Sequence, residues 1–235
     1  MGERLLYEGK AKRVLATGDP DVLLHRYKDE ATAFDGRKRG SWRGKGRTNA
    51  TMSAAMFRYL EEHGVPTHFI EQVDDTTLKT KRLEMLPVEV VVRNVAAGSL
   101  AKRLGYEEGT PLRQPVVELY LKNDELGDPL VNRYHLRELG VDDGTLAACE
   151  EMGLKVNDTL RPFFEERGIT LVDFKIEIGR DTEGNLLLAD EISPDTCRFW
   201  DRETGERLDK DRFRRDMGGV EEAYAEVLRR VTGEG

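Results

Sequence analysis

The stretch Leu171-Val-Asp-Phe-Lys-Ile-Glu-Ile-Gly179 decides the fold, because its apolar and charged residues alternate as in a long β-strand. Successive side chains of a strand point to opposite faces, so Asp173, Lys175 and Glu177 share one face and the apolar residues share the other. A charged strand face is ordinarily solvated. The segment that follows favours a different environment for these three charges.

The return strand of the same hairpin brings two carboxylates near each other. Residues 186–189 are all apolar, which predicts a strand buried on both faces, so the charged face beside it is expected to line a cleft. A two-residue turn at Glu183 and Gly184 would pair Glu177 with Asp190, whereas a three-residue loop with a bulge would shift this register. Two carboxylates this close need a cation between them, and Mg²⁺ bound by carboxylates and substrate phosphates is the usual solution. The hairpin therefore predicts half of a nucleotide and metal site.

The composition is that of a globular protein with one large domain or two lobes. The chain has 235 residues, of which 35% are charged and 38% hydrophobic. It has no run of about 18 apolar residues, the length that a helix needs to cross a membrane. The first residues lack the pattern of a secretion signal, so we expect a cytoplasmic protein. Cys149 and Cys197 have no metal-binding or disulfide spacing and are expected to be reduced.

The net charge of −8 argues against a general nucleic-acid-binding protein, because affinity for polyphosphate depends on a basic surface. Residues 37–47 are a local exception, with six basic residues and one tryptophan. Three interpretations remain open for this basic segment: a mobile solvated loop, a loop that folds over an anionic small molecule, and an RNA-binding loop.

Two segments near the N-terminus offer polar groups to a ligand. The turn Gly9-Lys-Ala-Lys12, in an expected antiparallel meander, combines two ammonium groups with closely approachable backbone, which suits phosphate; an ordinary basic turn is the alternative. Asp35 either hydrogen-bonds a substrate or caps the turn before the basic segment. The spacing of apolar residues then predicts a helix from Thr48 to His63, capped by Thr48 or Asn49.

A boundary between two lobes is expected at residues 83–87, where the strand pattern is interrupted before a strand at residues 88–93. An ATP site between lobes commonly uses such a connector to bind adenine. Arg93 ends this strand, and a buried guanidinium needs a partner. Ser99 begins a short helix nearby and either binds an anion or caps the helix. Lys122 ends another strand, where it would reach a phosphate.

Five blocks of sequence, taken together, point to one family. They are Leu6-Tyr-Glu-Gly-Lys-Ala-Lys-Arg13, Pro87-Val-Glu-Val-Val-Val-Arg-Asn-Val-Ala-Ala-Gly-Ser99, the stretch 171–179, Ala189-Asp-Glu-Ile-Ser-Pro-Asp195 and Asp209-Lys-Asp-Arg-Phe-Arg214. With these blocks the chain resembles the SAICAR synthetase family of purine biosynthesis over nearly its whole length.

The resemblance implies an α+β fold with two lobes. These are a small antiparallel lobe, residues 1–84, and a larger lobe related to ATP-grasp enzymes, residues 85–235, with the ATP site between them. It also implies a Mg²⁺-dependent ligase, most simply a homodimer, that uses ATP to join L-aspartate to the carboxylate of 4-carboxy-5-aminoimidazole ribotide. No nucleic acid or membrane partner is implied.

The same resemblance assigns roles to individual residues. ATP would be bound by Lys10, Ala11, Lys12, Arg82, Leu83 and Glu84, and Mg²⁺ by Glu177 and Asp190. Arg93, Ser99 and Arg198 would bind the ribotide phosphate, with Asp35 as a further candidate for substrate binding. Lys122, Asp173 and Lys175 would surround the nucleotide and the reacting carboxylate. A small-molecule kinase with the same Mg–ATP groups is the alternative, followed by a non-catalytic nucleotide-binding module.

Overall fold

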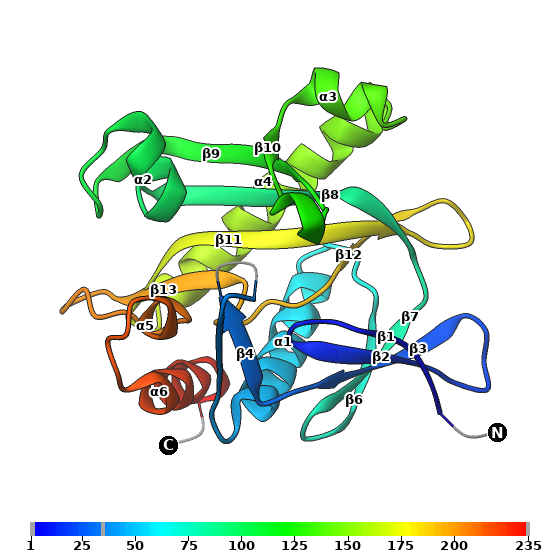
Figure 1. Cartoon of the computed structure of the whole chain (residues 1–235), viewed down its shortest axis with the longest axis horizontal. Coiled ribbons are helices and arrows are strands. Elements are labelled where there is room, and N and C mark those ends of the chain that lie inside the picture. Colours follow the sequence, from blue (N-terminus) through cyan, green and yellow to red (C-terminus); the bar gives the residue numbers. More distant parts are fainter. Residues whose placement is uncertain (1–2, 34–35, 234–235) are drawn as a thin grey trace.

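The computed structural model describes residues 3–33 and 36–233 (Figure 1). Its strands are β1 (Arg4–Glu8), β2 (Lys12–Ala16), β3 (Val22–Tyr27), β4 (Glu30–Ala33), β5 (Lys38–Ser41), β6 (Phe69–Asp74), β7 (Thr77–Lys81), β8 (Glu84–Val95), β9 (Pro111–Leu121), β10 (Leu130–Val131), β11 (Ile169–Arg180), β12 (Leu186–Ala189) and β13 (Cys197–Asp201). Its helices are α1 (Lys45–Glu62), α2 (Gly98–Leu104), α3 (Arg133–Glu138), α4 (Asp143–Glu165), α5 (Asp211–Arg214) and α6 (Val220–Thr232), with a 3₁₀ turn, η1, at Asp124–Leu126.

The described strands form two main antiparallel sheets and one hairpin. The first sheet has the order β1-β2-β3-β7-β6, and β4 pairs with β5 alone. The second has the order β10-β9-β8-β11-β12, with β13 also paired to β11. β11 is therefore central: β8 lies along one edge, and β12 and β13 share the other (Figure 1). The predicted mixture of helices with antiparallel sheets is confirmed.

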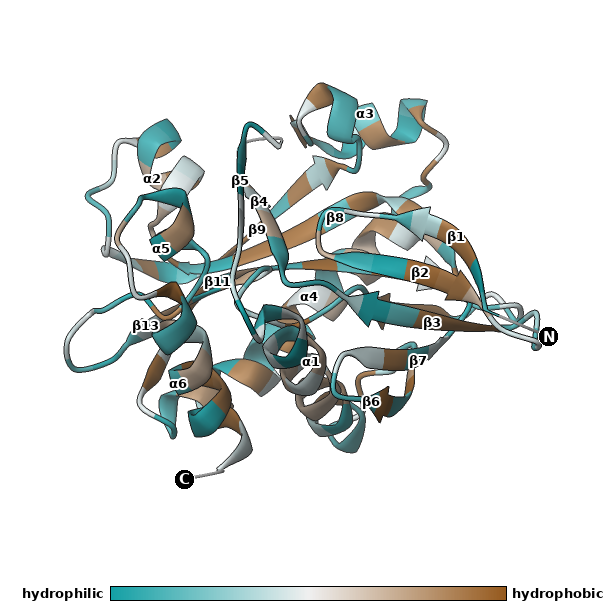
Figure 2. Ribbon diagram, turned by 60° about the horizontal axis from the view of Figure 1, so that its bottom comes forward, coloured by the Kyte–Doolittle hydropathy of each residue, from teal (hydrophilic) through white to brown (hydrophobic). Residues whose placement is uncertain are grey.

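The alternation predicted along β11 is also confirmed. Val172, Phe174, Ile176 and Ile178 are completely buried, and α4 packs against β11 and β8. Asp173 and Glu177 are buried as well, whereas the side chain of Lys175 between them is 25% exposed, so the charged face is largely shielded from bulk water. Brown hydrophobic segments along β8 and β11 mark this core in Figure 2.

Helix α1 begins earlier than predicted and is capped differently. It starts at Lys45, with Gly44 in the N-cap position and no side-chain cap of its own. The carboxylate of Asp29 instead accepts hydrogen bonds from the backbone N–H groups of Gly44, at 3.3 Å, and Gly46, at 2.9 Å. The predicted caps were wrong because a residue distant in sequence satisfies the exposed donors of the first turn.

The basic segment is not a solvated loop. Part of it forms β5, part begins α1, and Trp42 between them is buried against Phe213 and Tyr224. Lys38 lies 2.6 Å from a carboxylate oxygen of Asp216. The mobile-loop interpretation of residues 37–47 is therefore wrong.

The break expected at residues 83–87 begins where the chain passes from β7, which ends at Lys81 in the first sheet, to β8, which begins at Glu84 in the second, and it continues as a bulge within β8. Glu177 pairs with Glu89 but Gly179 pairs with Met85, so several β8 residues lie opposite one residue of β11. A bulge accommodates Pro87, which cannot donate a ladder hydrogen bond. A Cβ added at Gly179 would lie 2.8 Å from Cβ of Leu83, so the bulge packs directly on this glycine.

Replacing Gly179 by alanine is expected to lower the free energy of unfolding by about 1–3 kcal/mol, because overpacked sites must shift their neighbours. The added Cβ would also lie 3.0 Å from the backbone oxygen of Glu84, which cannot move aside as a side chain can. Urea denaturation measures this change. Gly18→Ala is the control, since an added Cβ there meets no atom within 4 Å. Equal stability of the two variants would contradict the close packing.

Two further expectations concern the chain as a whole. Cys149 and Cys197 are both free, as expected, and both are buried. No helix within residues 3–33 and 36–233 combines the length and the apolar character needed to cross a bilayer.

Candidate active site

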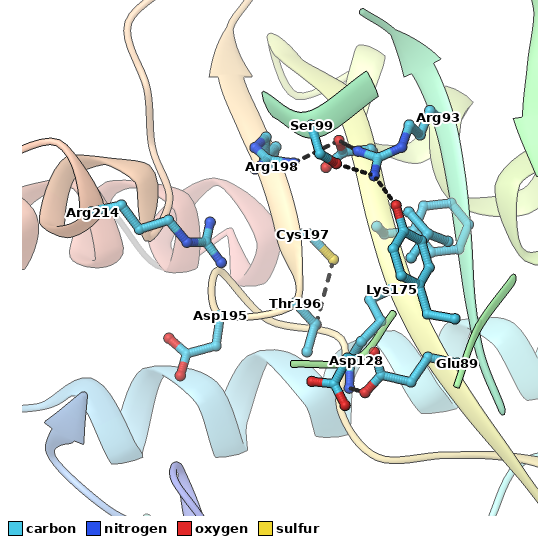
Figure 3. Close-up of a pocket in the computed structure, with 14 residues that line it drawn as sticks. Glu89, Arg93, Ser99, Asp128, Lys175, Asp195, Thr196, Cys197, Arg198 and Arg214 are labelled. Carbon is cyan, nitrogen blue, oxygen red and sulfur yellow. Dashed lines mark hydrogen bonds and ion pairs between the residues drawn. The ribbon is translucent and has the colours of Figure 1, made fainter. Parts of the chain in front are cut away.

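Two adjoining cavities lie over the charged face of β11, and together they are called the trough here. The first, of about 450 Å³, lies beside the turn 9–12. The second, of about 270 Å³, contains Arg93 and Arg198 (Figure 3). The residues that border both cavities are Glu89, Asp128, Lys175, Asp195 and Thr196.

Three carboxylates converge on the ammonium group of Lys175. Its Nζ lies 2.7 Å from Glu177, 2.9 Å from Asp190 and 3.1 Å from Glu89. Burial alone would lower the pKa of Lys175, but these carboxylates hold it well above its ordinary value, so the group stays charged. Lys122 also donates to Glu177. The structure thus brings together four residues that were selected from the sequence, Lys122, Lys175, Glu177 and Asp190. It adds Glu89, which was not selected.

The hairpin that carries these carboxylates has a different register from the predicted one. Glu177 pairs with Ala189 instead of Asp190. The predicted two-residue turn is wrong as well, because the carboxylate of Asp181 accepts a hydrogen bond from the backbone N–H of Asn185 at 2.8 Å and closes a longer turn. Turn length sets hairpin register, so both errors have one cause.

Asp190 nevertheless reaches the site through its backbone conformation. In a regular strand, a shift of one residue would turn its side chain to the opposite face. β12 ends at Ala189, however, and Asp190 has a φ of 67°, in the left-handed region that non-glycine residues seldom adopt. Its carboxylate contacts Lys175 and lies 2.6 Å from Nζ of Lys12. Burial raises the pKa of Asp190, but these lysines hold it well below its ordinary value.

The predicted phosphate turn borders the first cavity. Lys12 is mostly buried and contacts Asp190, while Nζ of Lys10 is more exposed and lies 2.7 Å from Asp124. The carbonyl of Ala11 accepts a hydrogen bond from the backbone N–H of Lys28 at 2.9 Å. Both ammonium groups are therefore held by carboxylates at the rim of a cavity, where an anion can replace or join these contacts.

The adenine-binding candidates lie apart from these lysines. Arg82 donates through Nε to the carbonyl of Pro20 at 2.5 Å and borders a separate surface cavity of about 650 Å³. Leu83 is half-buried against Gly179, and Glu84 is exposed. The described structure does not bring these three candidates into the trough. Asp35 lies outside the described residues.

Arg93 is buried at 4% exposure and is fully partnered, as expected for a guanidinium inside a protein. Its Nη1 lies 2.7 Å from Asp173 and its Nε lies 2.6 Å from Glu118. Its Nη2 donates to the hydroxyls of Tyr120, at 3.1 Å, and Ser99, at 3.2 Å. Glu118 and Tyr120 were missed from the sequence because they lie on β9, and the local pattern does not indicate which strand pairs with β8.

Arg198 forms a second cationic group in the lining of the second cavity, as Arg93 does. Its Nη1 lies 2.8 Å from the Asp173 oxygen that Arg93 also contacts, and its Nε lies 2.9 Å from Asp211. A Cβ on Gly98 would come within 2.7 Å of Nη2 of Arg198, so glycine is needed where α2 meets this guanidinium. Asp173 therefore orients two guanidinium groups at one end of the second cavity (Figure 3).

A buried triad under the trough was also missed. Lys45 is completely buried, with Nζ 2.7 Å from one carboxylate oxygen of Asp195, and the hydroxyl of Tyr224 donates to the other at 2.6 Å. Nothing in the sequence separates Lys45 from the other cations of residues 37–47. Asp195 does fall within a sequence block that matches the family, which is a signal that could have identified it.

Glu177 and Asp190 could hold a divalent cation, because their oxygens lie 2.7 and 2.9 Å from one ammonium group, closer to it than that of Glu89. Within residues 3–33 and 36–233, no group of three or more His, Cys, Asp or Glu side chains is arranged to hold a metal ion. A cation bound by these two carboxylates would take its other ligands from phosphate and water, as Mg²⁺ does.

Asp209 is a buried residue that binds the backbone beside Arg198. It is completely buried and accepts hydrogen bonds from the backbone N–H groups of Phe199, at 2.9 Å, and Asp211, at 2.7 Å. Burial and the nearby carboxylate of Asp211 raise the pKa of Asp209 to about 7. The folded protein therefore holds a proton here that an unfolded chain releases at lower pH.

Replacing Asp209 by asparagine is expected to flatten the pH dependence of stability. In the parent protein Asp209 contributes stability that is present at low pH and is lost as pH rises from about 4, near the unfolded pKa of 3.8, to about 7. The loss is about 1.4 kcal/mol per pH unit in that window. Urea denaturation at pH 5, 6, 7 and 8 measures it, with Asp158→Asn at an exposed position of α4 as the control. Parallel pH profiles of Asp209→Asn and the parent would contradict the assignment.

Comparison with known proteins identifies relatives over nearly the whole chain. The family model described as SAICAR synthetase matches residues 5–231. The phosphoribosylaminoimidazole-succinocarboxamide synthase of Coprothermobacter proteolyticus is 57% identical, over 97% of each chain. A SAICAR synthetase solved in complex with ADP is 53% identical, with a TM-score of 0.95 and 97% of each chain covered. The SAICAR synthetase of Pyrococcus horikoshii OT3 is 52% identical, with a TM-score of 0.92, and the match covers 95% of this chain and 98% of that one.

Proposed function

The chain belongs to the SAICAR synthetase family, and from this membership we propose that it joins L-aspartate to the carboxylate of 4-carboxy-5-aminoimidazole ribotide at the expense of ATP. The products are the succinocarboxamide, ADP and phosphate. The kinase alternative is not favoured, because full-length relatives are synthases of this one kind.

One observation carries the proposal. The trough has lysines and ionised carboxylates at one end and a pair of guanidinium groups at the other, as a reaction between a nucleotide and a phosphorylated acid requires. Lys175 borders both cavities, so it lies where two such substrates would meet.

At the nucleotide end, Lys10, Ala11 and Lys12 would bind the phosphates of ATP, and residues 82–84, which lie outside the trough, would contribute to the adenine pocket. Glu177 and Asp190 would hold Mg²⁺, which when bound offsets the charge of the phosphates. Lys122 and Lys175 would then face the transferred phosphoryl group and stabilise the charge on its oxygens.

At the other end, Arg93, Ser99 and Arg198 would bind the phosphate of the ribotide. Asp35, outside the described residues, stays a candidate for the same substrate. Asp173 contacts both guanidinium groups and would fix their geometry. This role would restrict the ribotide to one orientation, with its carboxylate towards Lys175.

The chemistry then proceeds in two displacements. A ribotide carboxylate oxygen attacks the γ-phosphorus, the bond from that phosphorus to the bridging oxygen breaks, and ADP leaves. The aspartate amine attacks the resulting acyl phosphate at carbon, the carbon–oxygen bond breaks, and phosphate leaves while the nitrogen gives up a proton. The trough supplies positioning and charge stabilisation for both steps.

Several finer features are part of the same proposal. Residues 1–84 and 85–235 would act as two lobes of an ATP-grasp-like arrangement with the nucleotide between them. A homodimeric assembly is a prediction of the resemblance, and a cytoplasmic location is a prediction of the sequence itself.

An ADP-release assay with each substrate omitted in turn tests the function. Sustained ADP release is expected only when ATP, the ribotide and L-aspartate are all present, and its amount should equal that of the amide product. A stable phosphorylated product formed in the presence of aspartate would overturn the ligase assignment.

A further inference from the structure

The loop between β9 and β10 brings one carboxylate, that of Asp128, to the border of both cavities of the trough. The other four residues at this border are engaged within the protein. Lys175 and Glu89 bind each other at 3.1 Å. The carboxylate of Asp195 is bound through both of its oxygens in the buried triad described above, and the hydroxyl of Thr196 donates to a backbone carbonyl at 3.1 Å. Asp128 is the exception.

Asp128 forms no ion pair with the residues in 3–33 and 36–233. Its Oδ1 accepts a hydrogen bond from the backbone N–H of Asn123 at 2.8 Å, and its Oδ2 receives none from the described part of the chain. Burial raises the pKa of Glu89, and the negative charges of Glu177 and Asp128 raise it further. Figure 3 shows Asp128 beside Glu89, so its charge acts inside the trough and is available to a ligand there.

The loop holds Asp128 in a fixed and uncommon conformation. Asp128 has a φ of 45°, in the left-handed region, and its backbone N–H donates to the carbonyl of Asn123 at 3.1 Å. The same loop reaches the predicted phosphate turn, where Asp124 lies 2.7 Å from Nζ of Lys10. Lys122, at its start, donates to a carboxylate of the β11 face. Strained backbone of this kind persists where the surrounding structure enforces it, and it is concentrated at functional sites.

The second displacement of the proposed reaction needs a proton acceptor beside the acyl carbon. This carbon would lie between the nucleotide and ribotide ends of the trough, the region that Asp128 borders. As the carbon–nitrogen bond forms, the nitrogen gains positive charge and must lose a proton, and a carboxylate within hydrogen-bond reach accelerates this transfer.

We propose that Asp128 is the general base that takes the proton from the attacking amine. The electron pair of the broken carbon–oxygen bond leaves with phosphate, and Asp128 gives the proton to solvent when the products depart. Lys175 would stabilise the oxygens of the departing phosphate, so the cation and the base have separate tasks. The assignment rests on the proposed ligase function.

Asp128→Asn tests the assignment. It is expected to lower kcat for amide formation by about 100- to 10,000-fold, the usual contribution of general-base catalysis. The KM values for ATP, ribotide and L-aspartate should stay within about twofold of the parent. Asparagine tolerates a positive φ, and its side-chain oxygen can still accept the hydrogen bond from Asn123, so the loop should keep its shape. Glu125→Gln, at an exposed position of the same loop, is the control.

Chemical rescue distinguishes a base from a residue that only shapes the loop. Asp128→Gly removes the carboxylate, and glycine adopts a positive φ without strain. Added formate should raise the turnover of this variant by about tenfold or more, because it supplies a carboxylate in the vacated space. Formate should not accelerate the parent protein or Asp128→Asn. Absence of rescue in Asp128→Gly would contradict the assignment.

A partial reaction separates the assignment from the function it rests on. The first displacement needs no proton acceptor, so positional isotope exchange in ATP with ribotide present and aspartate absent should run at the parent rate in Asp128→Asn. Loss of this exchange, a raised KM for ribotide, or parent-like kcat would overturn Asp128 as the base. Failure of the parent protein to exchange the isotope or to form the amide would instead overturn the ligase function.

Discussion

Asp190→Asn and Glu177→Gln are each expected to lower kcat by about three orders of magnitude, as losses of transition-state charge stabilisation do. Each substitution removes one of two carboxylates that converge on Lys175 and that are assigned to Mg²⁺. An amide keeps the size and some hydrogen bonds of the carboxylate but not its charge. The loss should therefore appear mainly in turnover and in the Mg²⁺ concentration required for it.

Both variants are expected to remain folded. In Asp190→Asn, Lys12 keeps Glu191 at 3.5 Å and Lys175 keeps Glu89 and Glu177, so no lysine is left without an anion. Thermal unfolding checks this, and steady-state assays across a range of Mg²⁺ concentrations check the turnover. Glu183→Gln, in the exposed turn of the same hairpin, is the matched control. Parent-like turnover in either site variant would refute the metal assignment.

Arg93→Met is expected to give the largest loss of stability, about 3–5 kcal/mol, because removing one partner of a buried ion pair leaves charge uncompensated. Asp173 and Glu118 have side chains only 5% and 9% exposed, and both lose their contact with Arg93. Tyr120 and Ser99 lose a hydrogen-bond donor as well. Turnover should fall with stability, because Asp173 would no longer be held against both guanidinium groups.

The substitution Arg93→Lys shows how much of the effect comes from the charge of Arg93 and how much from the geometry of its guanidinium group. A lysine keeps the positive charge but cannot reproduce the planar fork that contacts two carboxylates and two hydroxyls, so an intermediate loss is expected. Arg133→Met, at an exposed ion pair with Glu150, should change stability little. Urea denaturation and the KM for ribotide measure the two effects, and equal stability of Arg93→Met and Arg133→Met would contradict the buried network.

Local sequence patterns were sufficient for several features of the site. The alternation from Asp173 to Glu177 placed three charges on one strand face, and the structure puts them there. The burial of Arg93 beside partners followed from the cost of an unpaired guanidinium inside a protein. The basic turn 9–12 was located from two lysines and a glycine, and it borders the first cavity.

Other features depended on contacts that no local pattern records. The register between Glu177 and Ala189 follows from the turn that Asp181 closes, and Asp190 reaches Lys175 only through its left-handed backbone. The start of α1 depends on Asp29, which supplies the hydrogen-bond acceptor for the first turn. The mobile-loop interpretation of the basic segment failed for a similar reason, because Lys45 is buried against a distant carboxylate.

The sequence by itself therefore determined the family, the central strand and the types of charge that face the trough, because strand periodicity and short motifs are properties of neighbouring residues. Only the tertiary structure decided which charges meet: Lys175 with Asp190, Lys45 with Asp195, and Asp173 with both Arg93 and Arg198. The physical reason is that an ion pair depends on the separation of two groups in space. For residues far apart in the chain, that separation is set by how the sheets and helices pack.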